Sequence, residues 1–263
     1  MNKLKFTKMV GAGNDFVLID IRDKRQGTRD KGWSRVAQDL CQRKTGVGAD
    51  GLLVLEKSKR ADFRMRIFNA DGSEAEMCGN GLRCAALYVG KKGKAKVETK
   101  AGLYEATITG KNRVKIKMEE PKDLKSGFPI RVNDRRIRVS YVDTGVPHTV
   151  VFVQGIEKID VDSIGRSIRY HKEFKPRGTN VDFVEIIDDK NIKMRTYERG
   201  VEGETLACGT GAVAAAIISS VRCQVSGVNV HTKGGILKVY IGHKGVYLEG
   251  EARKVYQGEV NYV

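Results

Sequence analysis

The chain has 263 residues, enough for one large domain or two of ordinary size, and 40% of them are hydrophobic, so a buried core is expected. The 48 basic and 32 acidic residues give a net charge of +16, but the basic residues are spread along alternating segments such as residues 113–118. This spread is typical of a solvated enzyme surface and disfavours nucleic-acid binding. Residues 1–16 lack the apolar run of a signal peptide, and no stretch approaches the roughly 20 apolar residues of a membrane helix. We therefore expect a cytoplasmic protein that binds neither nucleic acid nor membrane.

The predicted elements are mostly short strands separated by glycine-rich turns. In the first half of the chain they cover residues 15–21, 51–57, 63–69, 95–100, 104–109 and 113–118. In the second half they cover residues 136–141, 148–153, 182–187, 192–197, 228–232, 236–241 and 245–249. Between the first two strands, apolar residues at helical spacing predict an amphipathic helix whose buried face is formed by Trp33, Val36, Ala37, Leu40 and Cys41.

Two further helices each follow a glycine-rich segment that opens with a cysteine. One follows Gly79-Asn80-Gly81 and covers residues 82–89; the other follows Gly209-Thr210-Gly211 and covers residues 212–218. The second helix is apolar on every side, which is typical of a helix buried all round. Its alanines would suit a small helix packed inside a curved sheet.

The five cysteines do not form a recognisable disulfide or zinc pattern. Their number is odd, and no CxxC pair occurs, so we expect free thiols and no metal site. Cys41, Cys84 and Cys223 are interpreted as core or linker residues. Cys78 and Cys208 differ because each stands directly before a glycine-rich helix start.

The chain repeats itself around these two cysteines. The strand at 63–69 is followed nine residues later by Cys78, and the strand at 193–198 is followed ten residues later by Cys208. Upstream, Asn14 and Asn180 each lie close to an Asp-Phe-Val strand, and we interpret them as a matching pair. The repeat predicts an α+β protein of two pseudo-symmetric lobes, each a mostly antiparallel curved sheet or barrel around a central buried helix.

We place the lobe boundary near residue 120. The N-terminal lobe, residues 1–119, carries Cys78, and the C-terminal lobe, residues 120–252, carries Cys208. The last strand, about residues 253–263, is free to return to the first lobe.

A cysteine directly before a helix has its sulfur near the unpaired N–H groups of the first turn, which favour the thiolate. The same N–H groups can hold a carboxylate. A single such site would suggest a nucleophilic cysteine. Two pseudo-symmetric sites instead suggest an acid/base pair, in which one thiolate removes the α-proton of an amino acid and the other thiol returns a proton to the opposite face. Such a pair inverts the carbon without a cofactor.

With these motifs, the chain resembles the diaminopimelate epimerase family, from Gly11-Ala12-Gly13-Asn14-Asp15-Phe16 through Glu198-Arg199-Gly200 to Ala207-Cys208-Gly209-Thr210-Gly211. The resemblance covers nearly the whole chain. It implies a cofactor-independent interconversion of LL- and meso-2,6-diaminopimelate, on the route to lysine and peptidoglycan. It also implies a two-lobed fold and a homodimer.

The resemblance also assigns roles to individual residues. It implies that Cys78 and Cys208 are the catalytic pair and that His148 and Glu198 are auxiliary groups, with His148 tuning a catalytic thiol. The implied substrate contacts are Asn14, Asn69, Gly79, Asn80, Asn180, Glu198, Arg199, Gly209 and Thr210. A fork-shaped arginine suits a distal carboxylate, and glutamate and asparagine suit ammonium groups. Val146 and Gly51 stand where some family members carry Asn and Gln, so two side-chain contacts near the distal end are absent here.

Several alternatives stay open at this stage. The chain could be a related cofactor-independent racemase acting on another amino acid, such as histidine or proline, or a basic binding protein that kept the fold and lost catalysis. The three asparagines could be turn residues, and His148 could cap a turn. The sequence does not decide which of the two thiols rests as the thiolate.

Overall fold

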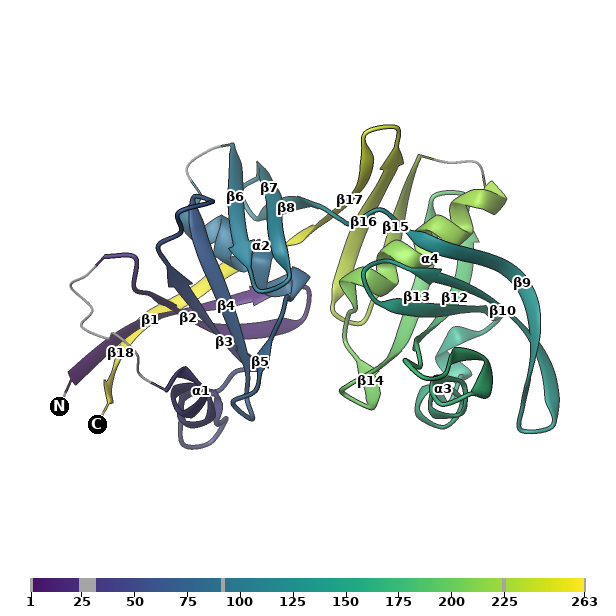
Figure 1. Cartoon of the computed structure of the whole chain (residues 1–263), viewed down its shortest axis with the longest axis horizontal. Coiled ribbons are helices and arrows are strands. Elements are labelled where there is room, and N and C mark those ends of the chain that lie inside the picture. The colour runs from purple at the N-terminus through teal and green to yellow at the C-terminus, as the bar shows by residue number, and fades with distance from the viewer. Residues whose placement is uncertain (1, 24–31, 91–92, 224–225, 263) are drawn as a thin grey trace. The chain divides into compact units, whose positions relative to one another are not determined.

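The computed structural model describes residues 2–23, 32–90, 93–223 and 226–262, and the chain divides into two compact units (Figure 1). The first unit comprises Met1–Ile116 and Gly250–Val263, and the second comprises Lys117–Glu249. Each unit is a sheet of mostly antiparallel strands with one helix inside its curve and one outside. This architecture confirms the predicted α+β class with two lobes.

The first unit is built from eight principal strands in the order β18-β1-β2-β3-β4-β6-β7-β8. Neighbours are antiparallel except for the pairs β2–β3 and β4–β6. The bounds are β1 (Asn2–Gly11), β2 (Asn14–Asp20), α1 (Trp33–Cys41), β3 (Gly51–Glu56), β4 (Phe63–Asn69), β5 (Glu74–Ala75), α2 (Gly79–Val89), β6 (Lys94–Thr99), β7 (Gly102–Gly110), β8 (Arg113–Lys117) and β18 (Arg253–Tyr262).

The second unit repeats this order as β9-β10-β11-β12-β13-β15-β16-β17, with parallel pairs again at the third and fifth junctions. Its bounds are β9 (Lys122–Val132), β10 (Arg135–Asp143), β11 (Pro147–Phe152), η1 (Ile156–Lys158), α3 (Val161–Arg169), η2 (Lys172–Phe174), β12 (Asn180–Asp188), β13 (Asn191–Glu198), β14 (Gly203–Thr205), α4 (Gly209–Cys223), β15 (Gly227–Thr232), β16 (Gly235–Gly242) and β17 (Gly245–Glu251).

The strand registers correct one detail of the predicted repeat. Phe16 pairs with Gly51 across the parallel β2–β3 junction, and His148 pairs with Asn180 across the parallel β11–β12 junction. The counterpart of Asn180 is therefore Gly51, and pairing Asn14 with Asn180 was wrong. The Asp-Phe-Val motif misled because it recurs on strands that hold different places in the two sheets.

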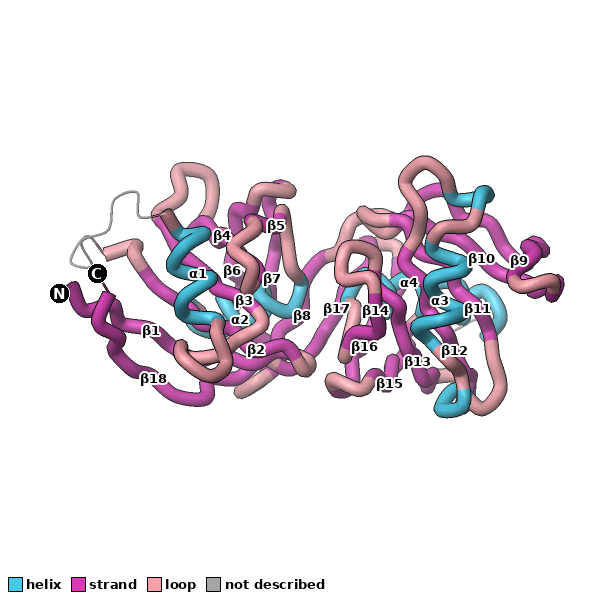
Figure 2. The backbone as a smooth tube through the Cα atoms, turned by 90° about the horizontal axis from the view of Figure 1, so that it is seen from below, coloured by secondary structure: helices cyan, strands magenta, loops and turns pink. Residues whose placement is uncertain are grey.

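The central strands are buried on both faces, which explains their continuous apolar sequences. On β3, Leu52 and Val54 pack in the cluster that contains α1, while Leu53 faces the start of α2. On β12, Val181 and Phe183 pack in the cluster that contains residues of α3. On β3 and β12, the residues that pack with the outer helices α1 and α3 alternate with Leu53 and Asp182, which lie beside the starts of the inner helices α2 and α4. Figure 2 shows α1 in front of the strands of the first unit and α3 in front of those of the second.

A matching ion pair holds the chain before each cysteine. Arg66 on β4 donates from Nε and Nη2 to Glu74 on β5, at 2.8 and 3.1 Å. Arg195 on β13 donates in the same bidentate way to Glu204 on β14, at 2.7 and 2.8 Å. Two parallel charge-assisted bonds fix direction as well as distance. The short strands β5 and β14 are therefore fixed four residues before Cys78 and Cys208.

Three of the longer elements were missed at the sequence level, as were the short elements β5, β14, η1 and η2. Strand β1 begins with alternation, but its pairing with β18 shifts register between Lys8 and Met9, and the alternation ends there. Strand β9 is largely exposed and presents no continuous apolar face. Helix α3 is capped by Asp160, the residue before it, whose side chain accepts a hydrogen bond from the N–H of Ser163. Among the described residues, no helix is long and apolar enough to cross a membrane.

We expect Gly165→Ala to destabilise the second unit by about 1–3 kcal/mol, because a Cβ at Gly165 would lie 2.5 Å from Cβ of the buried Tyr197 on β13. Urea unfolding followed by circular dichroism would measure the loss. Gly242→Ala is the matched control, since a Cβ there meets nothing within 4 Å. Equal stability of the two variants would contradict this packing of α3.

Candidate active site

Cys78 is the N-cap residue of α2, directly before its first helical residue, Gly79. Its backbone is extended (φ −143°, ψ 118°), and its Sγ accepts a hydrogen bond from the N–H of Gly81 at 3.5 Å. A Cβ at Gly81 would lie 2.9 Å from the side chain of Leu53, so a glycine lets the helix start this close to β3. The predicted thiol at a helix N-terminus is present in this unit.

A chain of amides runs away from this helix start. Asn80 donates from Nδ2 to Oδ1 of Asn14 at 2.6 Å, and Asn14 donates from Nδ2 to Asp50 at 3.0 Å. Asn14 is placed by the turn between β1 and β2, where Ala12 and Gly13 both have positive φ. Two of the sequence-predicted residues, Asn14 and Asn80, are thus brought together, and each uses part of its amide on the protein.

Asp50 and Asp15 anchor the far end of that chain. Arg43 donates to both carboxylates, at 2.6 Å to Asp50 and 3.0 Å to Asp15, and Lys8 forms an ion pair with Asp15 at 2.7 Å. Burial opposes ionisation of Asp15, but the bonds from Lys8 and Arg43 prevail and hold its pKa below the usual value. Asp50 was not singled out in the sequence because its contact with Asn14 spans 36 residues.

Asn69 lies at the end of β4 and is exposed. Its Nδ2 donates to the Ser73 hydroxyl at 2.9 Å, and its main-chain N–H donates to the Ser73 carbonyl at 2.8 Å. These contacts belong to the turn that leads into β5. They are the contacts expected if Asn69 is a turn residue. They leave the second amide hydrogen and the carbonyl oxygen of its side chain for other partners.

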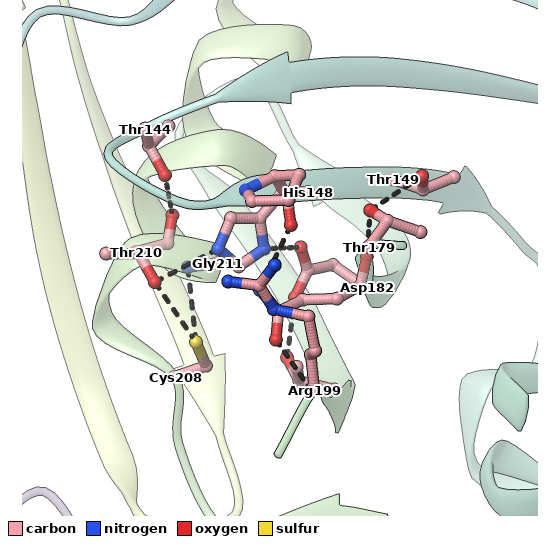
Figure 3. Close-up of polar contacts among 12 residues, drawn as sticks. Thr144, His148, Thr149, Thr179, Asp182, Arg199, Cys208, Thr210 and Gly211 are labelled. Atoms are coloured by element: carbon pink, nitrogen blue, oxygen red, sulfur yellow. Dashed lines mark hydrogen bonds and ion pairs between the residues drawn. The ribbon is translucent and has the colours of Figure 1, made fainter. Parts of the chain in front are cut away.

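Cys208 occupies the same place at the start of α4 and is buried (Figure 3). Its Sγ accepts from the N–H of Gly211 at 3.4 Å and lies 3.4 Å from Oγ1 of Thr210. A Cβ at Gly211 would lie 2.4 Å from a carboxylate oxygen of Asp182. Because residue 211 is glycine, the Asp182 carboxylate can lie directly against the start of α4. At the equivalent position of the first unit, Gly81 lies against the apolar side chain of Leu53.

A polar relay connects Cys208 to Asp182. Nε2 of His148 lies 3.0 Å from the Thr210 hydroxyl, and Nδ1 lies 2.7 Å from Asp182 (Figure 3). Because a carboxylate only accepts, Nδ1 donates to Asp182, and in the neutral ring Nε2 then accepts from the Thr210 hydroxyl. The Thr210 oxygen is left to face the Cys208 sulfur. His148 is fully buried within this relay and is connected to the Cys208 sulfur through Thr210.

Asp182 was missed in the sequence although it orients the histidine. It is fully buried, and the Thr196 hydroxyl donates to its other oxygen at 2.7 Å. The available signal was its position two residues after Asn180, on the same face of β12. Thr144, whose hydroxyl donates to the Thr210 carbonyl at 3.2 Å, was also missed.

Asn180 joins three strand ends of the second unit. Its Nδ2 donates to the Pro147 carbonyl at 3.0 Å, and its Oδ1 accepts from the main-chain N–H of Arg199 at 2.8 Å. Arg199 in turn donates from Nη1 to the Arg177 carbonyl at 3.2 Å. Burial and the like charges of Arg169 and Arg177 lower the pKa of Arg199, while the carboxylates of Glu202 and Asp143, which pair with those two arginines, act in the opposite direction.

Carboxylates oppose ionisation of Cys208. Burial raises the pKa of this thiol well above its ordinary value, and the charges of Glu198 and Asp182 raise it further. Burial likewise raises the pKa of Glu198, at the end of β13. Burial and these two carboxylates therefore favour the thiol form of Cys208, against the opposing hydrogen bond from the Gly211 N–H.

The remaining cysteines have core environments. Burial raises the pKa of Cys41 to about 11 and that of Cys84 to about 12, as expected for inert thiols. The Cys223 side chain lies outside the described part of the chain. Val146 is half-buried and Gly51 is buried, and a Cβ at Gly51 would lie 2.8 Å from the Phe68 carbonyl. The structure thus leaves no room for a larger residue at Gly51 without movement of β4.

Comparison with known proteins shows which family the chain resembles in sequence. The family model described as diaminopimelate epimerase matches residues 6–124 and 140–256. The chain is 44% identical to the diaminopimelate epimerase of Caldanaerobacter subterraneus subsp. tengcongensis, over 98% of this chain and 99% of that protein. It is 42% identical to the diaminopimelate epimerase of Aquifex aeolicus, over 98% of each.

Solved structures share the fold at much lower sequence identity. A Bacillus anthracis phenazine biosynthesis protein of the PhzF family matches with a TM-score of 0.73 at 18% identity, covering 100% of both chains. A hydroxyproline epimerase from Agrobacterium vitis matches with a TM-score of 0.64 at 16% identity, covering 98% of this chain and 92% of that one. These similarities concern the fold alone.

We expect Glu198→Gln to lower the pKa of Cys208, because it removes one of the charges that oppose the thiolate. Alkylation by iodoacetamide at pH 8 should then become about three- to tenfold faster at Cys208, since the thiolate is the reacting form. Peptide mass spectrometry would give the rate. Glu185→Gln, which changes a carboxylate bonded to the Gly155 N–H, should leave the rate unchanged; a rate unaltered by Glu198→Gln would refute the electrostatic assignment.

Proposed function

This chain belongs to the diaminopimelate epimerase family, and from that membership we infer that it interconverts LL- and meso-2,6-diaminopimelate by moving a proton at one α-carbon. The observation that carries the inference is the pair of cysteines, each bonded through its sulfur to an N–H at the start of a buried helix. The reaction is a step toward lysine and peptidoglycan.

The proposed chemistry uses Cys78 and Cys208 as the two proton carriers. One sulfur is ionised and takes the α-proton; the other is a thiol and delivers its proton to the opposite face of the same carbon. The exchange leaves the protonation states of the sulfurs reversed and the carbon inverted. This scheme needs no group beyond the two cysteines to carry the proton, so we propose a cofactor-independent reaction.

Acid/base groups alone supply only about 10² to 10⁴ in rate, so the carbanion needs further stabilisation. We propose that the main-chain N–H groups of Gly79 and Asn80, and of Gly209 and Thr210, bind the carboxylate next to the reacting carbon. Charge grows on that carboxylate as the proton leaves. Fixed N–H dipoles at a helix start favour such charge, and they are strongest in a site without water.

Auxiliary roles follow from the contacts in the second unit. His148, held by Asp182 and bonded to Thr210, is proposed to set the direction of the Thr210 hydroxyl beside Cys208. Glu198 opposes ionisation of the same thiol. Glu198 therefore favours Cys208 in the protonated form.

For the distal end of the substrate, we propose Arg199 as the partner of the carboxylate and Glu198, Asn14, Asn69 and Asn180 as partners of polar and ammonium groups. Burial acts against the charge of Arg199, and a carboxylate partner would offset that cost. An epimerase for a substrate without a charged far end, such as proline, would have no use for this arginine. Comparing turnover of diaminopimelate, histidine and proline separates these activities.

We further propose that residues 1–119 with 253–263 form a lobe that carries Cys78 and residues 120–252 a lobe that carries Cys208, and that the protein acts in the cytoplasm as a homodimer without binding nucleic acid or membrane.

We expect Cys78→Ala and Cys208→Ala each to lower epimerisation by at least about 10²- to 10⁴-fold, because each removes one proton carrier. Turnover of LL-diaminopimelate in deuterium oxide, followed by loss of the α-proton signal in NMR spectra, measures this directly. Cys41→Ala removes a buried thiol on α1 and should keep the activity. Absence of exchange in freshly reduced parent protein would overturn the assigned reaction, and full turnover in either catalytic variant would remove that cysteine from it.

We expect Arg199→Lys to raise the KM for diaminopimelate at least about tenfold with a smaller change in kcat, because lysine keeps the charge but loses the fork that fits a carboxylate. Steady-state kinetics at constant pH provides both constants. Arg131→Lys, at an exposed position on β9, serves as the control. An unchanged KM would place the distal carboxylate elsewhere.

A further inference from the structure

Helix α2 carries a buried arginine that the proposed reaction does not use. Arg83 is fully buried, and its Nη2 donates to Oδ1 of Asn80. Its Nε and Nη1 have no hydrogen-bond partner among the described residues. A guanidinium in such a place is costly unless an anion compensates it, so its surroundings indicate what that anion is.

The free edge of Arg83 points toward the start of its own helix. A Cβ built on Gly79 would lie 3.9 Å from Nη1 of Arg83. Gly79 directly follows Cys78, whose sulfur accepts from Gly81 in the same turn. The positive charge of Arg83 therefore adds to that of the helix N-terminus at the place where the Cys78 sulfur is held.

Two thiols are close enough to act on Arg83. Burial lowers the pKa of Arg83, and the charges of Cys84 and Cys78 act in the opposite direction. Cys84 stays protonated near neutral pH because burial raises its pKa to about 12. Cys78 is half-exposed and bonded to a main-chain N–H, so it is the better anion of the two.

Arg83 also sets the direction of the amide chain beside it. An arginine only donates, so Asn80 must present Oδ1 to Arg83 and Nδ2 to Asn14. Asn14 must then turn its own Nδ2 to Asp50, which only accepts as a carboxylate. Arg43 and Lys8 neutralise the acidic end of this chain, at Asp50 and Asp15, away from the thiol.

In the second unit, the same arrangement of strands and helix surrounds the cysteine with different side chains. The residue five positions after Cys208, as Arg83 is after Cys78, is the buried Val213. The registers that equate Phe16 with His148 also equate Leu53 with Asp182. Arg83 and Leu53 lie beside one helix start, and Asp182 and His148 lie beside the other.

We propose that Arg83 is a positioning residue that keeps Cys78 as the resting thiolate, while Cys208 rests as the thiol. This assignment rests on the proposed function of the two cysteines. In the resting enzyme the Cys78 sulfur accepts the α-proton with its lone pair, and the Cys208 S–H bond breaks to protonate the opposite face. The turnover ends with Cys78 protonated and Cys208 ionised, and proton exchange between the sulfurs and water restores the resting state.

The test measures the rate of Cys78 alkylation by iodoacetamide between pH 6 and 10 in full-length protein, by peptide mass spectrometry. The parent should react at nearly the same rate from pH 7 upward. In Arg83→Met the rate at pH 7 should fall about tenfold and recover at higher pH, because a pKa about one unit above the pH leaves only about a tenth of the sulfur as thiolate. Arg83→Lys, which retains the charge, should stay within about threefold of the parent, and the Cys208 rate should not change.

Arg195→Met is the matched control, because it removes a largely buried arginine that is bonded to Glu204 in the other unit. It should leave the Cys78 profile unchanged. A folded Arg83→Met protein with the parent's Cys78 profile overturns the inference. Failure of both Arg83→Met and Arg83→Gln to fold would also overturn it, since Arg83 would then be structural. Alkylation requires no turnover, so the effect of Arg83 on Cys78 can be measured whether or not the protein is an epimerase. A parent protein that does not exchange the α-hydrogen of diaminopimelate contradicts the proposed reaction but does not alter the alkylation result.

Discussion

The N–H groups in the first turn of a helix have no partner within the helix, so they must find one elsewhere. In α2 and α4 one of these partners is the sulfur of the preceding cysteine. Glycine three residues later is then required in both helices, since a Cβ would strike Leu53 in one and Asp182 in the other. The N–H groups that favour a thiolate also suit a substrate carboxylate, so one structural need creates both halves of the proposed chemistry.

The two units show how one backbone arrangement can carry unequal chemistry. Both have the same strand order, the same two parallel junctions and the same bidentate Arg–Glu pair before the cysteine. They differ in the side chains around the helix start, where Arg83 corresponds to Val213. A reversible proton transfer needs one base and one acid at a time. Different surroundings for two like sulfurs provide that difference without different residues at the reacting positions.

The fold by itself says less than the site. Proteins of the PhzF family and a hydroxyproline epimerase share this architecture at 16–18% identity. Function on a shared fold depends on particular side chains, and here these stand at strand ends and helix starts. Family membership comes instead from 42–44% identity over nearly the whole chain.

The sequence alone determined most strands, the two buried helices and the two cysteines. These features are written in local patterns: β-branched runs, an all-apolar helix and glycines beside each cysteine. It did not reveal β1 or β9, because a register shift ends the alternation in one and the other lacks a continuous apolar face. It also paired Asn14 with Asn180, although strand pairing equates Asn180 with Gly51.

Only the tertiary structure decided which groups surround each thiol. Asp182 contacts His148 across 34 residues, and Asn80 contacts Asn14 across 66. Such contacts follow from strand register and from the depth at which a helix packs, which no local pattern encodes. The burial of Arg83 also depends on packing, because the sequence of an apolar helix does not show whether a charged residue within it faces water or the core. The sequence therefore determined that two cysteines stand at helix starts, and packing decided how differently the two are charged.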